Sequence, residues 1–459
     1  MKKRKSLQIS LFFILFALSF LLMVQPAKAW NIHPLFMHPV LFSMPEVKNS
    51  KPVTAKSLKS FLTEEEQGLA KLLIQEEKWA QNNLEWYMPR PDTQVFKATG
   101  DGGDIVQRFV QAIRINPDFR IQLYLQLLPG DDRKGRSPIS KNEITFLKEE
   151  DLEYLNSTTF VALKEGEDVT PLEVVVSATD EPDLGIDVGL YSDNSTRFGK
   201  TYGFGTQAFG NPNLDYGSQA PFHMGFYHES KILYAFAGFL KETYPEYRIH
   251  LFKTLAEFAF RRGQDYWGWR FMGWGLHYLG DLSQPYHTTV FPGTSTTRVL
   301  WINVLAMAGF PGAKNDAVQI LSNRHIVLER FQQEIFQRAY RQSSPSFPIF
   351  KILKSPANIP AYKDSFPREK LARKSNAIAA ELNDIITNSA PHKFISDPKF
   401  EFGKYKEAGQ IIENIKKSKG QEGVDSLVRM IGEAMKPLTV YGRSYVLDIL
   451  KPGETTAKQ

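Results

Sequence analysis

Apolar side chains recur every three to four positions along most of the chain, and this spacing predicts amphipathic helices rather than strands. The first long stretch opens with Thr63 and three glutamates, a typical helix start. The stretch 158–176 fits either a short strand or a helix, because periodicity does not decide between them there. The stretches with helical spacing are 63–86, 104–115, 119–128, 230–260, 265–282, 316–340, 372–389 and 423–435. We therefore predict an all-α fold.

Two segments break the helical pattern. Residues 185–219 are rich in Gly, Asn, Asp, Ser and Tyr, which predicts a long loop with a functional role. Residues 343–366 are rich in Pro and Ser and are expected to connect two helices. The sequence contains no internal repeat and no low-complexity tract, so we predict one helical domain with inserted loops.

The first 29 residues have the three parts of a secretory signal peptide. Basic residues at 2–5 precede an uncharged apolar run at 9–24, and the small residues Ala27 and Ala29 follow. The run is short for a helix that spans a bilayer core of about 30 Å. We predict a signal peptide that is cleaved after Ala29. The mature domain 30–459 would then be exported to the periplasm, the cell surface or the medium.

Removal of the leader changes the charge of the chain. The full sequence has 56 basic and 50 acidic side chains, and the leader contains five of the basic ones and none of the acidic ones. The mature chain is therefore close to neutral, with 51 against 50, and its overall charge does not predict a nucleic-acid-binding surface. The sequence also contains no cysteine, so any metal site must use nitrogen and oxygen ligands.

The strongest candidate for chemistry is the segment 275–287, Gly-Leu-His-Tyr-Leu-Gly-Asp-Leu-Ser-Gln-Pro-Tyr-His. His277 and Asp281 are four residues apart, so both side chains lie on one face of a helix. An imidazole and a carboxylate at this spacing can share a divalent cation. Pro285 ends the helix, and the turn can bring His287 to the same region.

Two further features gain weight beside that segment. His325 and Glu329 repeat the four-residue spacing in a second predicted helix, although such a pair alone is more often a solvated surface pair. Trp30 becomes the first residue of the mature chain if cleavage follows Ala29. Its free amine and its carbonyl oxygen could then chelate a metal together.

Together these residues resemble the zinc-dependent phospholipase C / S1-P1 nuclease family. The matching features are a signal peptide that ends directly before Trp30, the block His277-x3-Asp281-x5-His287, and His325-x3-Glu329. The central block is specific, and the resemblance covers residues 230–330 and the N-terminus but is loose elsewhere. It implies a phospholipase C/P1 nuclease-like helical domain that holds three zinc ions in a cleft.

The resemblance also implies which residues bind the ions. One zinc would take Trp30 and an early histidine, with Asp281 bridging to a second zinc. That second ion would also take His277 and an upstream aspartate and histidine. In chain order, the expected zinc ligands are Trp30, His38, Asp183, His223, His277, Asp281, His287, His325 and Glu329. Asp183 could also orient the attacking water, which makes it the candidate catalytic residue.

Three of these ligands have a nearby alternative. The choices are His38 over His33, Asp183 over Asp180, and His223 over His228. His38 is preferred because Pro39 fits the first turn of a helix, which would leave His38 near the helix start.

The chain departs from the family in the length of its connections. The segment 94–177 is predicted to be an insertion, and the links from Asp183 to His223 and from His287 to His325 are also longer. The last link contains 299–310, an uncharged apolar stretch. We interpret it as a buried core helix, with an apolar rim that touches lipid as the alternative. The C-terminal half shows no strand-rich pattern like the lipid-binding β-sandwich of the family's toxin members.

These expectations describe an exported zinc-dependent phosphodiesterase. Zinc would lower the pKa of a bound water toward neutrality and neutralise the phosphodiester. A phospholipase C-like reaction on phospholipid, with peripheral membrane contact as an option, is preferred because of the apolar stretch 299–310 and the near-neutral charge. One alternative is an S1/P1-type single-strand nuclease, which would prefer a basic groove with stacking aromatics. Another is a secreted metal-binding helical protein without turnover. No protein partner is inferred.

Overall fold

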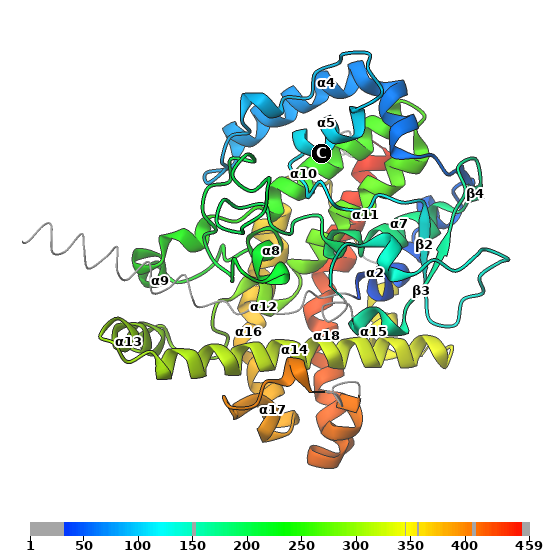
Figure 1. Cartoon of the computed structure of the whole chain (residues 1–459). Coiled ribbons are helices and arrows are strands. Elements are labelled where there is room, and N and C mark those ends of the chain that lie inside the picture. The colour runs from blue at the N-terminus through cyan, green and yellow to red at the C-terminus, as the bar shows by residue number, and fades with distance from the viewer. Residues whose placement is uncertain (1–31, 149–152, 345, 356–357, 406–409, 452–459) are drawn as a thin grey trace, which may run out of the picture.

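Helices account for most of the structure. The computed structural model describes residues 32–148, 153–344, 346–355, 358–405 and 410–451, so the predicted signal peptide, its cleavage point and Trp30 lie outside the described residues. Within these ranges the strands form only two short antiparallel pairs (Figure 1). The predicted all-α class is therefore confirmed.

The elements follow one another along the chain with short connections in most places. The α-helices are α2 (His33–Phe42), α3 (Pro45–Lys48), α4 (Leu58–Asn83), α5 (Ile105–Ala112), α6 (Lys141–Ile144), α7 (Pro171–Ala178), α8 (Asp215–His223), α9 (Lys231–Phe236), α10 (Pro245–Arg261), α11 (Asp265–Asp281), α12 (Pro285–Thr288), α13 (Thr296–Met307), α14 (Gly312–Arg341), α15 (Pro348–Lys354), α16 (Arg373–Ser389), α17 (His392–Ser396) and α18 (Ile411–Leu450). The strands are β1 (Val53–Thr54), β2 (Tyr124–Leu127), β3 (Thr159–Ala162) and β4 (Asp168–Val169). Short 3-10 turns are η1 (Asp92–Gln94), η3 (Glu153–Ser157), η4 (Glu181–Leu184), η5 (Gly238–Lys241) and η7 (Phe402–Lys404), and η6 (Pro367–Ala372) is a π-helical turn.

Helix α11 lies at the centre of the protein. Every residue of this helix after Asp265 is buried, and α7, α10 and α18 pack against it (Figure 1). Helices α10 and α11 form a hairpin, because only three residues separate them. A helix that is enclosed on all sides needs apolar or small residues around its whole circumference. Because α11 also carries His277 and Asp281, these two candidate ligands lie in the core.

Two glycines allow other elements to approach α11 closely. A Cβ atom on Gly273 would lie 2.6 Å from the Cβ atom of Ala178 and 2.6 Å from the carbonyl oxygen of Val175, both in α7. A Cβ atom on Gly280 would lie 2.7 Å from Cδ2 of His33 in α2. Atoms in a close-packed interior cannot approach so closely. Glycine at these two positions therefore allows α7 and His33 to reach the ligand-bearing helix.

The segment 94–177, predicted to be an insertion, is built into the helical core. Its strand β4 pairs with β1, which precedes the segment, through Val169 opposite Val53. Strands β2 and β3 pair within the segment, with Tyr124 opposite Ala162. Helix α7 at its end packs against α11 and α2. The segment therefore helps to position the candidate site.

The prediction of a helix over 119–128 was wrong, because this stretch contains strand β2. Apolar side chains alternate at Ile121, Leu123, Leu125 and Leu127. A period of two places alternate side chains on one face of a strand. The alternation of apolar and other residues over 121–127 is therefore typical of a strand. The high number of apolar residues in the stretch also fits a helix, which led to the wrong prediction.

In three other stretches, the structure contains more elements than the sequence predicted. The open stretch 158–176 contains strand β3 and most of helix α7. The stretch 230–260 divides into α9, η5 and α10, with Pro245 in the first turn of α10. Proline lacks the N–H donor that would continue a preceding helix. The predicted connection 343–366 contains the short helix α15.

The apolar stretch 299–310 forms most of α13 but is not buried in the core, contrary to the preferred prediction. Val299 and Ile302 are buried, whereas Trp301 and Phe310 are exposed. Figure 1 shows α13 at the outer end of α14, away from the central helices. Across the described part of the chain, no helix combines the length and the apolar character needed to cross a membrane.

Candidate metal centre

Eight buried imidazole and carboxylate side chains converge in the core. They are His33 (α2), Asp183 (η4), His223 (α8), His277 and Asp281 (α11), His287 (α12), and His325 and Glu329 (α14). None is more than 7% exposed. Their ligand atoms form three groups, within each of which the atoms lie no more than 4.8 Å apart, and each group could hold a metal ion.

The first group consists of His33, Asp183 and His277. Nδ1 of His33 lies 3.8 Å from Oδ2 of Asp183, and Nε2 of His277 lies 3.7 Å from Oδ1 of Asp183. Both oxygens of Asp183 are buried and accept no hydrogen bond from the described residues. An ionised carboxylate that is buried without compensation costs several kcal/mol. The surroundings of Asp183 therefore suit a bound cation.

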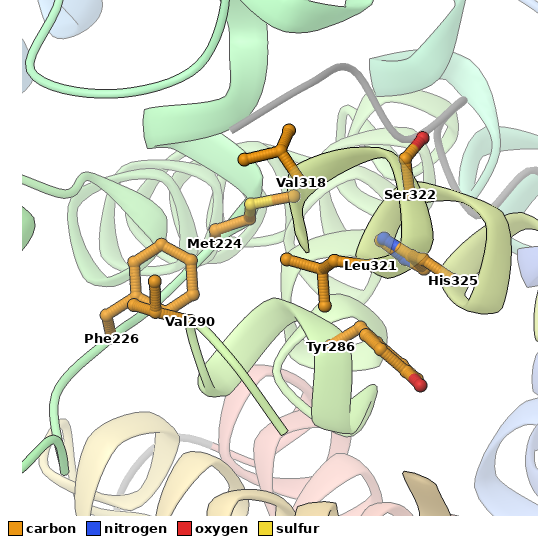
Figure 2. A pocket seen from close by; sticks show the side chains of 8 residues that line it. All are labelled: Met224, Phe226, Tyr286, Val290, Val318, Leu321, Ser322 and His325. Atoms are coloured by element: carbon orange, nitrogen blue, oxygen red, sulfur yellow. The ribbon is translucent and has the colours of Figure 1, made fainter. Parts of the chain in front are cut away.

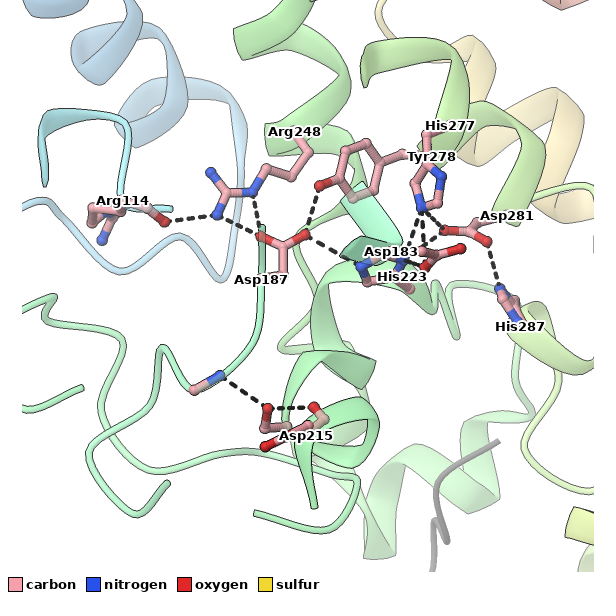
Figure 3. A network of polar contacts seen from close by, with 12 residues as sticks. Arg114, Asp183, Asp187, Asp215, His223, Arg248, His277, Tyr278, Asp281 and His287 are labelled. Atoms are coloured by element: carbon pink, nitrogen blue, oxygen red, sulfur yellow. Dashed lines mark hydrogen bonds and ion pairs between the residues drawn. The ribbon is translucent and has the colours of Figure 1, made fainter. Parts of the chain in front are cut away.

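The second group consists of His223, His277 and Asp281, and Asp281 also reaches toward the other two groups. Its Oδ2 is 2.9 Å from Nδ1 of His223 and 3.2 Å from Nε2 of His277. Its Oδ1 is 3.2 Å from Nδ1 of His287 and 3.6 Å from Nε2 of His33. Figure 3 shows Asp281 between His287 on one side and His223 and His277 on the other. Because the two oxygens face different imidazoles, this carboxylate is placed to contact two ions.

The third group consists of His287, His325 and Glu329. Oε1 of Glu329 lies 2.8 Å from Nε2 of His325, one helical turn away, and 3.8 Å from Nε2 of His287. The ring of His325 stacks on Tyr286, with 5.1 Å between centroids and 11° between planes. This stacking holds the imidazole of His325 toward Glu329.

The spacing within the cluster fits atoms that surround a metal. Ligand atoms about 2.1 Å from a tetrahedral zinc lie about 3.4 Å from one another. Most of the nitrogen–oxygen distances in the cluster are between 3.2 and 3.8 Å. Direct N–H···O hydrogen bonds are usually shorter, with a mode of about 2.9 Å. Imidazole nitrogen and carboxylate oxygen are also the donors that first-row divalent metals use in proteins without cysteine ligands.

Groups outside the cluster fix the orientation of two histidines. Nδ1 of His277 donates to the carbonyl oxygen of Thr179 at 2.8 Å, which leaves the lone pair of Nε2 directed into the cluster. Nε2 of His223 lies 3.3 Å from Oδ2 of Asp187. Asp187 is held by Arg248, whose Nε and Nη2 donate to Oδ1 at 2.9 and 2.7 Å (Figure 3). Second partners of this kind orient metal-binding imidazoles.

The short turn η4, which carries Asp183, is fixed to α11 by a buried ion pair. Oε2 of Glu181 accepts hydrogen bonds from Nε of Arg270 at 3.0 Å and from Nε1 of Trp274 at 2.5 Å. All three side chains are buried. The position of Asp183 relative to α11 is therefore set by the core packing and not by a free loop.

In the absence of a cation, the cluster favours protonated histidines. Burial opposes protonation of His33, but Asp180 and Asp281 outweigh it and raise the pKa of His33 to about 9. Burial also opposes protonation of His223, yet Asp187 and Asp281 raise its pKa to about 10. These carboxylates therefore attract positive charge, which protons or metal ions can supply.

Other members of the cluster shift in different directions. Burial and the neighbouring His33 lower the pKa of His277 to about 4. Burial raises the pKa of Asp183 well above its usual value. Burial acts in the same sense on Asp281, but His277 and His287 hold its pKa well below the usual value. His277 is thus a neutral imidazole near neutral pH, the form that binds a metal.

The structure places His33, and not the preferred His38, in the cluster. Helix α2 begins at His33 with Pro34 in its first turn, and Pro39 lies inside the helix. His38 is five residues further on and points to another face, where its Nδ1 lies 3.1 Å from the hydroxyl of Tyr340. The prediction assumed that Pro39 occupies the first turn of a helix, but Pro34 occupies it. The preference for His38 was therefore wrong.

For the other two ambiguous positions, the structure places the preferred residues, His223 and Asp183, in the cluster. His223 lies in the cluster, whereas Nε2 of His228 donates to a backbone carbonyl at 2.8 Å. Asp183 belongs to the first group of ligand atoms. Asp180 lies beside that group, with its Oδ1 3.7 Å from Nδ1 of His33.

Three supporting residues were missed in the sequence. Thr179 contributes a backbone carbonyl, and no side-chain pattern reports such a role. Asp187 lies four residues after Asp183, but its partner Arg248 is on α10, 61 residues away from it. Only the folded structure brings them together.

The cluster borders an apolar pocket on the side of His325. The pocket is lined by Met224, Phe226, Tyr286, Val290, Val318, Leu321, Ser322 and His325 (Figure 2). His325 and Glu329 retain 4% and 7% exposure, whereas His33, His277 and Asp183 are fully buried. An apolar space beside a few polar groups is typical of ligand pockets. The pocket therefore adjoins the third group, through His325.

Compared with protein-family models, with curated proteins and with solved structures, the chain matches none of them.

Proposed function

We propose that this chain is an exported zinc-dependent phosphodiesterase with phospholipase C-like activity. The observation that carries the proposal is the convergence of three adjacent ligand groups in one buried cluster, with Asp281 between them. The donor types and their spacing suit zinc. The order of the motifs along the chain resembles that of the zinc-dependent phospholipase C / S1-P1 nuclease family.

Three zinc ions are proposed. Following the family resemblance, the first zinc would be held by His33, Asp281 and the amine and carbonyl of Trp30, and the second by His223, His277, Asp183 and Asp281. The third would be held by His287, His325 and Glu329, which form one group in the structure. Trp30 lies outside the described residues, but it precedes His33 by only three positions. Three residues reach about 10 Å at most. Cleavage after Ala29 would therefore free an amine close to the first group.

The residues of the chain would prepare the site for hydrolysis of a phosphodiester. When bound, the ions lower the pKa of a water and neutralise the phosphate, so that hydroxide can attack phosphorus. Thr179 keeps the proton of His277 on Nδ1, and Asp187 orients His223. Asp183 is proposed as a ligand that also orients the attacking water. The apolar side chains beside His325 would face the apolar part of the ester.

The experiment that tests this proposal starts from the chain exported with its own leader. The exported protein is sequenced from its N-terminus, and its metal content is measured by mass spectrometry. It is then assayed on a short-chain soluble phosphatidylcholine and on single-stranded DNA, with and without a chelator. We expect Trp30 as the first residue, about three zinc ions per chain, and chelator-sensitive release of phosphocholine.

Each other outcome has a defined meaning. Cleavage of DNA in place of lipid would assign an S1/P1-type nuclease. Bound zinc without cleavage of either substrate would favour a metal-binding protein without turnover. A correctly folded protein that binds no divalent metal would contradict the proposal as a whole.

A further inference from the structure

Four large apolar side chains are exposed on the part of the protein around α13. Trp301 is 62% exposed, Phe310 68%, Ile232 58% and Val304 38%. We call these four residues the apolar edge. Exposed apolar residues are common when they are scattered singly, but a group of them near a ligand pocket marks an interaction surface.

The helices that carry the apolar edge are anchored to each other and to the body of the protein. Oγ of Ser230 and Oγ1 of Thr296, at the starts of α9 and α13, are 3.4 Å apart. Leu233, Val299 and Val318 from α9, α13 and α14 belong to one hydrophobic cluster beneath them. The inward faces of α9 and α13 are therefore packed, and the apolar edge is what these helices leave to the outside.

The charges of these two segments have one sign. Helices α9 and α13 contain Lys231 and Arg298 and no acidic residue, whereas Lys314 at the start of α14 is buried and the exposed Asp316 follows it. Lys231 and Arg298 are exposed beside the apolar edge. Apolar and aromatic residues together with basic ones are the combination that binds an anionic lipid surface.

The size of the apolar edge favours a lipid surface over a second protein chain. Four partly exposed side chains of these types offer roughly 400 Å². A stable interface between two proteins buries about 800 Å² on each partner. A bilayer needs only a few aromatic and aliphatic side chains at its boundary.

The apolar edge also continues toward the candidate metal centre. Helix α14 begins two residues after Phe310 and carries His325, which lies about 20 Å from its start at 1.5 Å per residue. Val318 and Leu321 of the same helix line the pocket beside His325 (Figure 2). The apolar side chains of Val318 and Leu321 therefore lie on α14 between its start beside the apolar edge and His325 of the third ligand group.

We propose that Ile232, Trp301, Val304 and Phe310 seat the protein on an anionic phospholipid surface, with the pocket beside His325 facing the lipid. This proposal deepens the proposed phospholipase C-like function and rests on it. It predicts that the enzyme works on aggregated lipid better than on dissolved lipid, because docking places the metal centre beside its substrate.

The test uses the exported full-length protein and vesicles of equimolar phosphatidylcholine and phosphatidylglycerol. Binding is measured by co-sedimentation, and pure phosphatidylcholine vesicles test the charge dependence. The variant Ile232→Ser/Trp301→Ser/Phe310→Ser should bind the mixed vesicles at least about tenfold more weakly than the unchanged protein. The matched control is Trp86→Ser, because Trp86 is an exposed tryptophan far from α13 in the sequence and 39% exposed.

The absence of cysteine allows a direct readout of insertion. A polarity-sensitive dye is attached to Phe310→Cys, or to Ile74→Cys on α4 as a control, since Ile74 is 44% exposed. Figure 1 shows α4 at the top of the protein and α13 at the lower left. Only the dye at position 310 should report an apolar environment when vesicles are added.

The outcomes separate docking from catalysis. The triple variant should hydrolyse dissolved short-chain phosphatidylcholine at the normal rate while losing activity on vesicles. If no lipid is hydrolysed but vesicles bind through position 310, the proposed function fails and the docking surface stands. Equal dye responses at 310 and 74 would overturn the docking proposal. So would a dimer in sedimentation velocity that the triple variant dissociates without any vesicle binding.

Discussion

Two sets of buried carboxylates lie next to each other in this protein and are neutralised in different ways. Asp187 and Glu181 face guanidinium groups at hydrogen-bonding distance, 2.7 Å to Arg248 and 3.0 Å to Arg270. Asp183 faces imidazoles at 3.6 to 3.8 Å. A guanidinium is always charged and closes the site, whereas a neutral imidazole offers a lone pair to a cation. The arginine pairs are therefore already neutralised, whereas the histidine cluster could still hold a metal ion.

The largest effect is expected from Asp281→Asn, which removes the charge between the ligand groups. We expect the loss of up to two bound ions, because both oxygens of Asp281 face ligand histidines. Turnover on phosphodiesters should fall at least about 1000-fold, or about 4 kcal/mol in transition-state stabilisation. Metal content and initial rates measure this.

The control for this variant is Asp265→Asn at the exposed start of the same helix. It should retain metal and activity. Full zinc content together with normal turnover in Asp281→Asn would remove the basis of the site assignment.

The contribution of the buried arginine–carboxylate pairs to stability is tested by Arg270→Met. The substitution leaves Glu181 buried without its cation, and a broken buried pair costs about 3–5 kcal/mol in the free energy of unfolding. Denaturant unfolding measures the loss. In Arg373→Met, where the arginine is 58% exposed and its partner Glu369 is 42% exposed, the cost should stay below about 1 kcal/mol. Equal losses in the two variants would show that burial of the pair does not matter here.

In the histidine cluster, we expect bound protons to be exchanged for metal ions in a pH-dependent way. In the metal-free protein, the pKa values of His33, His223 and His287 are raised to about 9, 10 and 9. Burial opposes each rise, and neighbouring carboxylates outweigh it. Metal binding near neutral pH should therefore release protons. Apparent affinity should rise about tenfold per pH unit for each proton displaced, or about 1.4 kcal/mol.

Calorimetry in buffers of different ionisation enthalpy counts the released protons. The same shifts affect stability. Protonated histidines stabilise the metal-free fold fully below their ordinary pKa near 6.5, and this stabilisation is lost as the pH rises through 9 to 10. A metal-free protein with the same stability at pH 7 and pH 10 would contradict this account.

The smallest effect is expected from His38→Gln, outside the cluster. It removes the contact with Tyr340, which is worth about 1 kcal/mol of stability, and should leave the metal content unchanged. His33→Gln, one and a half helical turns away, should lose metal from the first group. Metal loss in His38→Gln, with unchanged metal content in His33→Gln, would show that His38 and not His33 is the early ligand.

The ligands on α11 and α14 were predictable because each pair lies within one helix. His277 with Asp281, and His325 with Glu329, repeat at a spacing of four, and a helix converts that spacing into proximity. The structure brings both pairs together with His287. The all-α class was predictable for the same reason, since helical periodicity is a local property.

The parts that could not be predicted depend on contacts between distant segments. His33 and His38 are each followed by a proline, and only the packing of α2 against Gly280 of α11 shows which histidine is enclosed. The partnership of Asp187 with Arg248 likewise joins two elements far apart in the sequence. The exposure of α13 was missed because an uncharged apolar helix has the same composition in a core and at a surface.

The eight candidate ligand residues lie between positions 33 and 329, so ions bound by the three groups would tie together segments that are far apart in the sequence. A cross-link that closes a long loop restricts the unfolded chain strongly. In a protein without cysteine, such ions would take the place of disulfides, but as links that can dissociate and be replaced. The stability of the protein would then follow the concentration of free metal around it.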